Sequence, residues 1–167
     1  MSRAVLSLGS NLGDRLAHLQ SAVDGFAESV VAVSPVYETA PWGVTDQPDF
    51  LNAVIVVAAA DVDEWGWLRR GQELERAAER LRERRWGPRT LDVDVVTVDG
   101  VRGADPELLL PHPGTPDRAT VLIPWSVVEP DAVLPGHGPI AELISALPAA
   151  DLNSVQRRDD LPLHLPS

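Results

Sequence analysis

The residues best suited to chemistry lie in one ten-residue stretch, Arg85-Trp-Gly-Pro-Arg-Thr-Leu-Asp-Val-Asp94. Gly87-Pro88 prevents a helix from running through it, and Leu91 to Val98 is rich in β-branched residues, which predicts a strand. Successive strand side chains point to opposite faces, so Asp92 and Asp94 share one face. Two such carboxylates repel each other unless a cation lies between them. Together with the nearby arginines, they indicate a site for Mg²⁺ and a polyphosphate.

The alternative for the two aspartates alone is an edge strand whose charged side chains face water. The arginine-containing turn favours the phosphate site, because the planar guanidinium pairs well with phosphate oxygens. All 14 basic residues are arginines, eight of them between Arg69 and Arg89, in a chain of net charge -11. Such a chain lacks the broad positive surface of a nucleic-acid-binding protein. A local arginine cluster suits a small anion.

The length of 167 residues predicts one domain over residues 1–150, with a disordered or loosely docked tail at 151–167. The absence of cysteine excludes disulfides and thiolate metal sites. No apolar signal segment follows the first residues, and the longest apolar run, Phe50 to Ala60, is too short to cross a bilayer. We therefore expect a cytoplasmic, monomeric protein that binds neither membrane nor nucleic acid.

Hydrophobic periodicity predicts four strands and two helices in the order βαββαβ. The strands are Ala4–Leu8, Val30–Glu38, Phe50–Ala60 and Leu91–Val98; the helices run from a cap at Asp14 to about Ala27, and from Asp61 or Asp63 to about Arg84. This order predicts an α+β ferredoxin-like sandwich, an antiparallel sheet with both helices on one face. Two further helices are expected, at Pro116–Val128 and Ile140–Leu147.

Other candidate residues have two interpretations each. His112 lies between two prolines, six residues before Arg118, but a lone histidine is more often structural. Trp42 and Phe50 flank a loop near Asn52, so they are either core residues or a platform for a flat heterocycle. The sequence has no HExxH motif and no GxSxG motif, which argues against zinc or serine hydrolysis.

Five ordered segments resemble the 6-hydroxymethyl-7,8-dihydropterin pyrophosphokinase family. They are Leu8-Gly-Ser-Asn-Leu-Gly13, Tyr37-Glu-Thr-Ala-Pro-Trp-Gly43, Gln47-Pro-Asp-Phe-Leu-Asn52, Arg85 to Asp94, and Leu110-Pro-His-Pro113 with Arg118. The resemblance implies the same ferredoxin-like fold. It also implies transfer of the β,γ-pyrophosphoryl group of ATP to the hydroxymethyl oxygen of the pterin, leaving AMP, in folate biosynthesis.

The resemblance also implies roles for individual residues. Asp92 and Asp94 correspond to ligands of two Mg²⁺ ions, and Arg80 and Arg89 to residues that stabilise the transition state. The ATP-contacting set is Gln72, Glu75, Arg82, Arg85, Arg89, His112 and Arg118. The pterin-binding set is Thr39, Pro41, Trp42, Phe50 and Asn52.

Two positions depart from the family pattern. Thr120 stands where the family usually has an aromatic residue that stacks on the pterin, and Glu79 stands where it commonly has glycine. The second departure leaves the assignment of Arg80 and Arg82 open by one residue.

Two rival functions remain. One is a non-catalytic ferredoxin-like module that binds a nucleotide, and the other is a kinase that transfers only the γ-phosphoryl group. The product separates them: AMP for pyrophosphoryl transfer, ADP for a kinase, and neither for a binding module.

Overall fold

A computed structural model describes residues 2–39, 49–79 and 90–166 of the chain. Over these residues, six strands form one antiparallel sheet, in the order β10-β3-β4-β1-β5 with β2 also paired to β4. Their bounds are β1 Ser2–Ser10, β2 Val30–Val33, β3 Tyr37–Thr39, β4 Phe50–Ala59, β5 Asp92–Val98 and β10 Gln156–Arg157. The α+β class is therefore confirmed.

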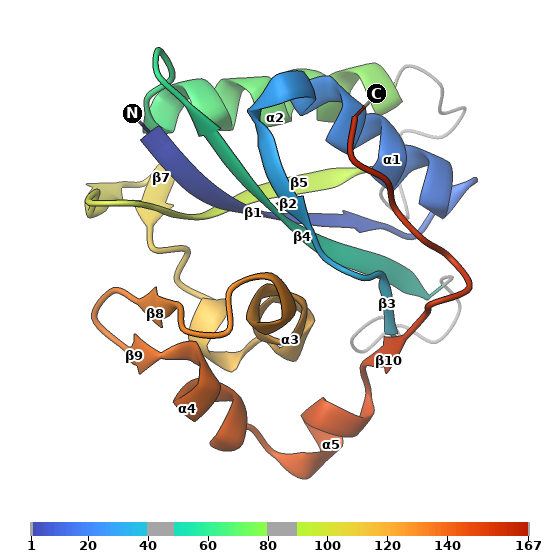
Figure 1. Ribbon diagram of the computed structural model, residues 1–167, viewed down its shortest axis with the longest axis vertical. Helices are drawn as coiled ribbons and strands as arrows, with labels where there is room; N and C mark the ends of the chain where they lie inside the picture. The colour runs from blue at the N-terminus through green and yellow to red at the C-terminus, as the bar shows by residue number, and fades with distance from the viewer. Residues whose placement is uncertain (1, 40–48, 80–89, 167) are drawn as a thin grey trace.

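The sheet lies between two layers of helices (Figure 1). Helices α1 (Arg15–Phe26) and α2 (Glu64–Glu79) cover one face. Helices α3 (Ala119–Val128), α4 (Ile140–Ser145) and α5 (Ala149–Asn153) lie on the other side. Alternation along β1 separates two cores: Leu6 and Leu8 pack beneath α1 and α2, whereas Val5 packs beneath α3.

Caps and buried anchors explain where the first two helices begin. Asp14 caps α1, since its Oδ1 accepts a hydrogen bond from the Ala17 N–H at 3.1 Å. Asp63 does the same for α2, accepting from the Gly66 N–H at 2.7 Å. Trp67, which is fully buried, holds α2 on the sheet and donates its Nε1–H to Ser2 Oγ at 2.9 Å. The predicted cap at Asp14 is confirmed, and the second helix is capped by Asp63 rather than Asp61.

The predicted strand Val30–Glu38 is wrong as a single element, because it divides into β2 and β3 around Ser34-Pro35. Proline has no N–H to donate to a ladder, and Ser34 Oγ instead accepts from the Val54 N–H at 2.9 Å. The predicted helix at Pro116 also begins later: a 3₁₀ turn, η2 (Thr115–Asp117), precedes α3. The predicted end of the second helix near Arg84 lies outside the described residues.

Short elements that sequence periodicity did not predict complete the chain. They are the turn η1 (Ala27–Ser29), the hairpins β6 (Gly103–Asp105) with β7 (Leu108–Leu110) and β8 (Val133–Leu134) with β9 (Gly138–Pro139), and also α5 and β10. Beyond α5, β10 pairs antiparallel with β3, and the Arg158 N–H donates to the Val36 carbonyl at 2.8 Å. The disordered or loosely docked state expected for residues 151–167 in solution stays a prediction.

Among residues 2–39, 49–79 and 90–166, none of the helices combines the length and apolar composition needed to cross a lipid bilayer.

Candidate active site

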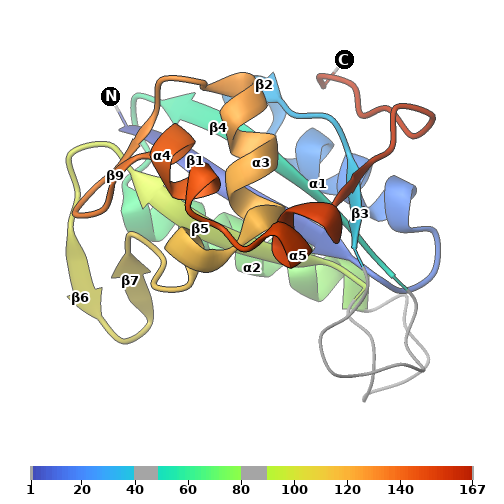
Figure 2. The same ribbon diagram turned by 90° about the horizontal axis from the view of Figure 1, so that it is seen from below.

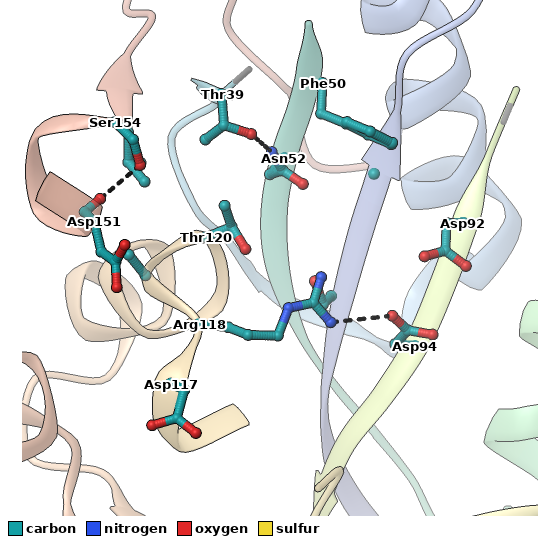
Figure 3. A pocket seen from close by; sticks show the side chains of 14 residues that line it. Thr39, Phe50, Asn52, Asp92, Asp94, Asp117, Arg118, Thr120, Asp151 and Ser154 are labelled. Atoms are coloured by element: carbon teal, nitrogen blue, oxygen red, sulfur yellow. Dashed lines mark hydrogen bonds and ion pairs between the residues drawn. The ribbon is translucent and has the colours of Figure 1, made fainter. Parts of the chain in front are cut away.

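A pocket of about 430 Å³ opens on the part of the sheet that α3 leaves uncovered. Figure 3 shows residues from distant parts of the chain around it. The described residues that line it are Ser7, Gly9, Thr39, Phe50, Asn52, Asp92, Asp94, Asp117, Arg118, Ala119, Thr120, Asp151, Ser154 and Val155. The structure thus brings predicted pterin-binding residues and predicted metal ligands into one cavity.

The sheet register places three of these residues in one row. Gly9 of β1 pairs with Asn52 of β4 on one side and with Asp92 of β5 on the other. A Cβ atom on Gly9 would lie 3.3 Å from Asn52 Oδ1. Gly9 therefore leaves open the floor of the pocket between an amide and a carboxylate.

The amide of Asn52 is oriented by its neighbour on β3. Its Nδ2–H donates to Thr39 Oγ1 at 3.2 Å, and both side chains are buried (Figure 3). This bond turns the carbonyl oxygen toward Gly9. Phe50, two residues earlier, lines the same pocket. The Asn52 side chain therefore fits both interpretations. Its N–H group is already bonded to Thr39, and its residue lines the pocket, where the carbonyl oxygen can accept a hydrogen bond from a ligand.

The two strand carboxylates share the pocket face, as the alternation predicted, while Leu91, Val93 and Val95 belong to the core under α1 and α2. Arg118 extends toward them, with its Nη1 at 4.0 Å from Asp94 Oδ2 (Figure 3). The two side chains are 44% and 29% exposed, so solvent and ligands reach this ion pair.

These carboxylates fit Mg²⁺ that enters together with a polyphosphate. Within the described part of the chain, no cluster of three or more histidine or acidic side chains could hold a metal ion. Mg²⁺ is commonly held by one or two carboxylates, with phosphate oxygens and water completing its shell. Asp92 and Asp94, next to each other on one face of β5, match that requirement.

Two other predicted ATP contacts lie next to β5. Glu75 of α2 accepts from the Val93 N–H through Oε2 at 3.0 Å, so it ties the helix to the strand between the two aspartates. His112 follows β7, and its N–H donates to the Val96 carbonyl at 2.8 Å. Its side chain lines a smaller cavity of about 200 Å³ together with Asp94. Gln72 is exposed on α2.

A model of the 7,8-dihydro-6-hydroxymethylpterin-pyrophosphokinase (HPPK) family matches residues 5–130. The 2-amino-4-hydroxy-6-hydroxymethyldihydropteridine pyrophosphokinase of Mycobacterium tuberculosis (strain H37Rv) is 46% identical over 168 residues, covering 93% of this chain and 89% of that protein. The chain belongs to this family. The same-named protein of Mycobacterium leprae is 54% identical over 144 residues, covering 80% of this chain and 75% of its own length.

Solved structures carry the same fold. A substrate complex of an HPPK-DHPS has a TM-score of 0.69 at 11% identity, covering 87% of this chain and 43% of that one. Plasmodium falciparum HPPK-DHPS A437G with STZ-DHP has a TM-score of 0.67 at 13% identity, covering 86% and 45%. This HPPK chain therefore spans less than half of those chains, and the likeness concerns the fold.

Family membership confirms the resemblance found in the sequence and the prediction of an ATP-dependent pyrophosphokinase of folate biosynthesis. Enzymes of this family use ATP and magnesium. Six of the predicted site residues lie outside the described residues: Pro41, Trp42, Arg80, Arg82, Arg85 and Arg89.

Sequence reasoning missed several residues that line the pocket: Ser7, Gly9, Asp117, Ala119, Asp151, Ser154 and Val155. The first two had a detectable signal, because small Ser7 and Gly9 alternate with buried Leu6 and Leu8 on one strand. The last three had none, since their place depends on how the C-terminal segment docks.

Proposed function

We propose that this HPPK chain transfers the β,γ-pyrophosphoryl group of ATP to the hydroxymethyl oxygen of 6-hydroxymethyl-7,8-dihydropterin. The hydroxyl oxygen attacks the β-phosphorus, the bond between the α,β-bridging oxygen and that phosphorus breaks, and AMP leaves with the bridging oxygen while the hydroxyl proton is lost. The observation that supports this most is the row of Asn52, Gly9 and Asp92, which puts an amide and a carboxylate at the two sides of one pocket.

Asp92 and Asp94 are proposed to hold two Mg²⁺ ions that arrive with ATP. When bound, these ions neutralise the phosphate oxygens and the charge that develops in the transition state. The strand keeps both carboxylates on one face, and Glu75 braces that strand through the Val93 N–H. The aspartates therefore need little reorganisation when the nucleotide binds.

The ring end of the pocket is proposed to bind the pterin through Phe50 and Asn52. The Phe50 ring supplies a flat apolar contact. The Asn52 carbonyl oxygen accepts a hydrogen bond from a ring N–H, while Thr39 holds the amide in that orientation. Pro41 and Trp42, outside the described residues, are proposed to complete this end.

The nucleotide is proposed to bind along the β5 side of the pocket. Arg118, whose guanidinium is beside Asp94, would contact phosphate oxygens, and His112 lies close enough to β5 to join it. Gln72, Glu75, Arg82, Arg85 and Arg89 complete the proposed set. Arg80 and Arg89 are proposed to stabilise the transition state, with Arg82 as the alternative to Arg80.

We further infer that the core is a ferredoxin-like sandwich. The strand order β3-β4-β1-β5 and the two helix crossovers on one face support this classification. A monomer in the cytoplasm remains our proposal for the state and location of the protein.

Product analysis tests the function. The purified chain is incubated with Mg-ATP and 6-hydroxymethyl-7,8-dihydropterin, and the nucleotides and pterins are separated. We expect AMP and the pterin diphosphate in equal amounts. ADP with a pterin monophosphate would indicate a kinase instead, and the absence of turnover with retained nucleotide binding would indicate a binding module.

A further inference from the structure

The C-terminal segment 151–155 forms one wall of the pocket, although it is distant in sequence from the other lining residues. Asp151, Ser154 and Val155 line the same cavity as Phe50 and Asn52. In Figure 3, Asp151 and Ser154 lie on the side of the pocket opposite Asp92 and Asp94. They come from α5 and from the turn before β10, and in Figure 2 the chain leaves α5 and runs beside β3, with which β10 pairs.

Val155 provides the apolar part of this wall. It is half-buried and packs against the core beneath α3. Among the described lining residues, Phe50 is the one aromatic side chain, and Val155 is the one aliphatic side chain larger than alanine. A flat ring bound in a pocket needs apolar contact. Val155 can therefore supply contact in addition to that from Phe50.

The charge on this wall matches a neutral ring better than a phosphate. Asp151 brings a carboxylate to the pocket on the side away from the cation-binding aspartates. A carboxylate repels phosphate oxygens but accepts hydrogen bonds from ring N–H groups. Since Mg²⁺ would neutralise Asp92 and Asp94 but not Asp151, this charge favours the polyphosphate at β5 and the heterocycle beside α5.

Glu38 of β3 ties this segment to the sheet. Its Oε1 accepts from Arg158 Nη1 at 2.6 Å, and its Oε2 accepts from Arg15 Nη1 at 2.7 Å. Arg15 Nη1 also donates to the Asp49 carbonyl at 2.8 Å, next to Phe50. The side chains of Glu38 and Arg158 are 18% and 31% exposed, so the ion pair lies at the edge of the solvent. The same carboxylate therefore connects the tail, α1 and the start of β4.

We propose that segment 151–155 is an acceptor-binding wall, which contacts the pterin ring through Val155 and is positioned by the Glu38–Arg158 ion pair. The proposal rests on the function proposed above and extends it: selection of the pterin depends on a segment that docks from the far end of the chain. Glu38 acts as a positioning residue, and Val155 as a residue that touches substrate.

The test compares two variants, Val155→Ala and Glu38→Gln, in the full-length chain. Calorimetry gives the Kd of a non-hydrolysable ATP analogue alone, and then the Kd of the pterin in its presence. We expect pterin binding about fivefold weaker in Val155→Ala, from lost apolar contact, and about threefold weaker in Glu38→Gln, from looser docking. The analogue Kd and kcat should stay unchanged while the pterin KM rises.

Asp159→Asn is the matched control, since Asp159 is exposed and pairs with Arg157 inside the tail. It should leave both Kd values unchanged. The wall proposal is overturned if both variants bind the pterin as tightly as the unaltered chain does. It is also overturned if a variant binds the nucleotide and the pterin more weakly by the same factor. If the unaltered chain forms AMP and pterin diphosphate, the proposed function stands in either case; if it binds no pterin, both proposals fail.

Discussion

Asn52 and Asp92 lie in one cross-strand row of the sheet, each paired with Gly9 on the strand between them. The backbones of Asn52 and Asp92 are thus two strand spacings apart, and Gly9 on the strand between them has no side chain. Strand spacing is about 4.8 Å, so the gap is close to the length of a small bicyclic heterocycle. The distance between the proposed ring-binding amide and the proposed metal-binding carboxylate is therefore set by hydrogen bonds of the backbone.

Gly9→Ala should weaken pterin binding about tenfold, because the added methyl group overpacks the pocket floor near Asn52 Oδ1. Calorimetry with an ATP analogue measures the change. The free energy of unfolding should change little, since the entropy that alanine removes from the unfolded chain offsets the cost of the tight contact with Asn52. Loss of stability in parallel with binding would contradict a role in the pocket.

Asp94→Asn should lower kcat about a hundredfold or more, because metal-assisted charge neutralisation contributes several kcal/mol to the transition state. Single-turnover kinetics with Mg-ATP measures the loss, and thermal unfolding checks the fold. Asp99→Asn is the control, since Asp99 is exposed in the turn that follows β5. An Asp94→Asn chain with nearly normal turnover would refute the metal assignment.

Arg118→Ala should weaken binding of the ATP analogue about tenfold, because hydrogen bonds to charged groups contribute about 1.5–3 kcal/mol. Arg118→Lys should restore only part of it, since a point charge cannot pair with two oxygens at once. Arg69→Ala, on the exposed side of α2, serves as the control. Equal affinity in the alanine variant and the unaltered chain would remove Arg118 from the nucleotide site.

Thr120→Phe should strengthen pterin binding by about 0.5–1.5 kcal/mol, the value of an added aromatic contact. Thr120 is half-buried in the pocket wall at the start of α3, beside Arg118. Calorimetry with the analogue present measures the gain. Unchanged or weaker affinity would mean that another side chain already occupies that side of the ring.

Docking of the tail should weaken in acid. The hydrogen bond from Arg15 lowers the pKa of Glu38 below its ordinary value of 4.5; burial opposes this shift, and Arg158 adds to it. A depressed pKa in the folded state means that the stabilisation is complete above about pH 4.5 and is lost as the pH falls through the folded pKa. The protection of the Arg158 amide, relative to its free-peptide exchange rate, should therefore decrease in acid.

Glu38→Gln provides the control for this pH dependence. Its Arg158 amide should be less protected at neutral pH, and its protection should no longer change as the pH falls through the range in which Glu38 titrates. The same acid-induced loss in both chains would assign the effect to a different group.

Period-two alternation on β5 was sufficient to place Asp92 and Asp94 on one face, because alternation is a property of a single strand. The arginine and proline motifs likewise indicated the family without any structure. Helix starts were predictable where a side chain caps the backbone locally, as at Asp14. The break between β2 and β3 also had a local signal, since Pro35 has no N–H to donate, but the predicted strand ran through it.

Only the tertiary structure decided that Gly9 separates Asn52 from Asp92, since the register between strands is set by packing across the sheet. It also decided that Val155 reaches the pocket, because that contact requires the tail to dock on β3 through Glu38. Both features join residues far apart in the chain, where local propensity carries no information. The sequence thus determines which chemical groups the site contains, whereas long-range backbone pairing determines the distances between these groups.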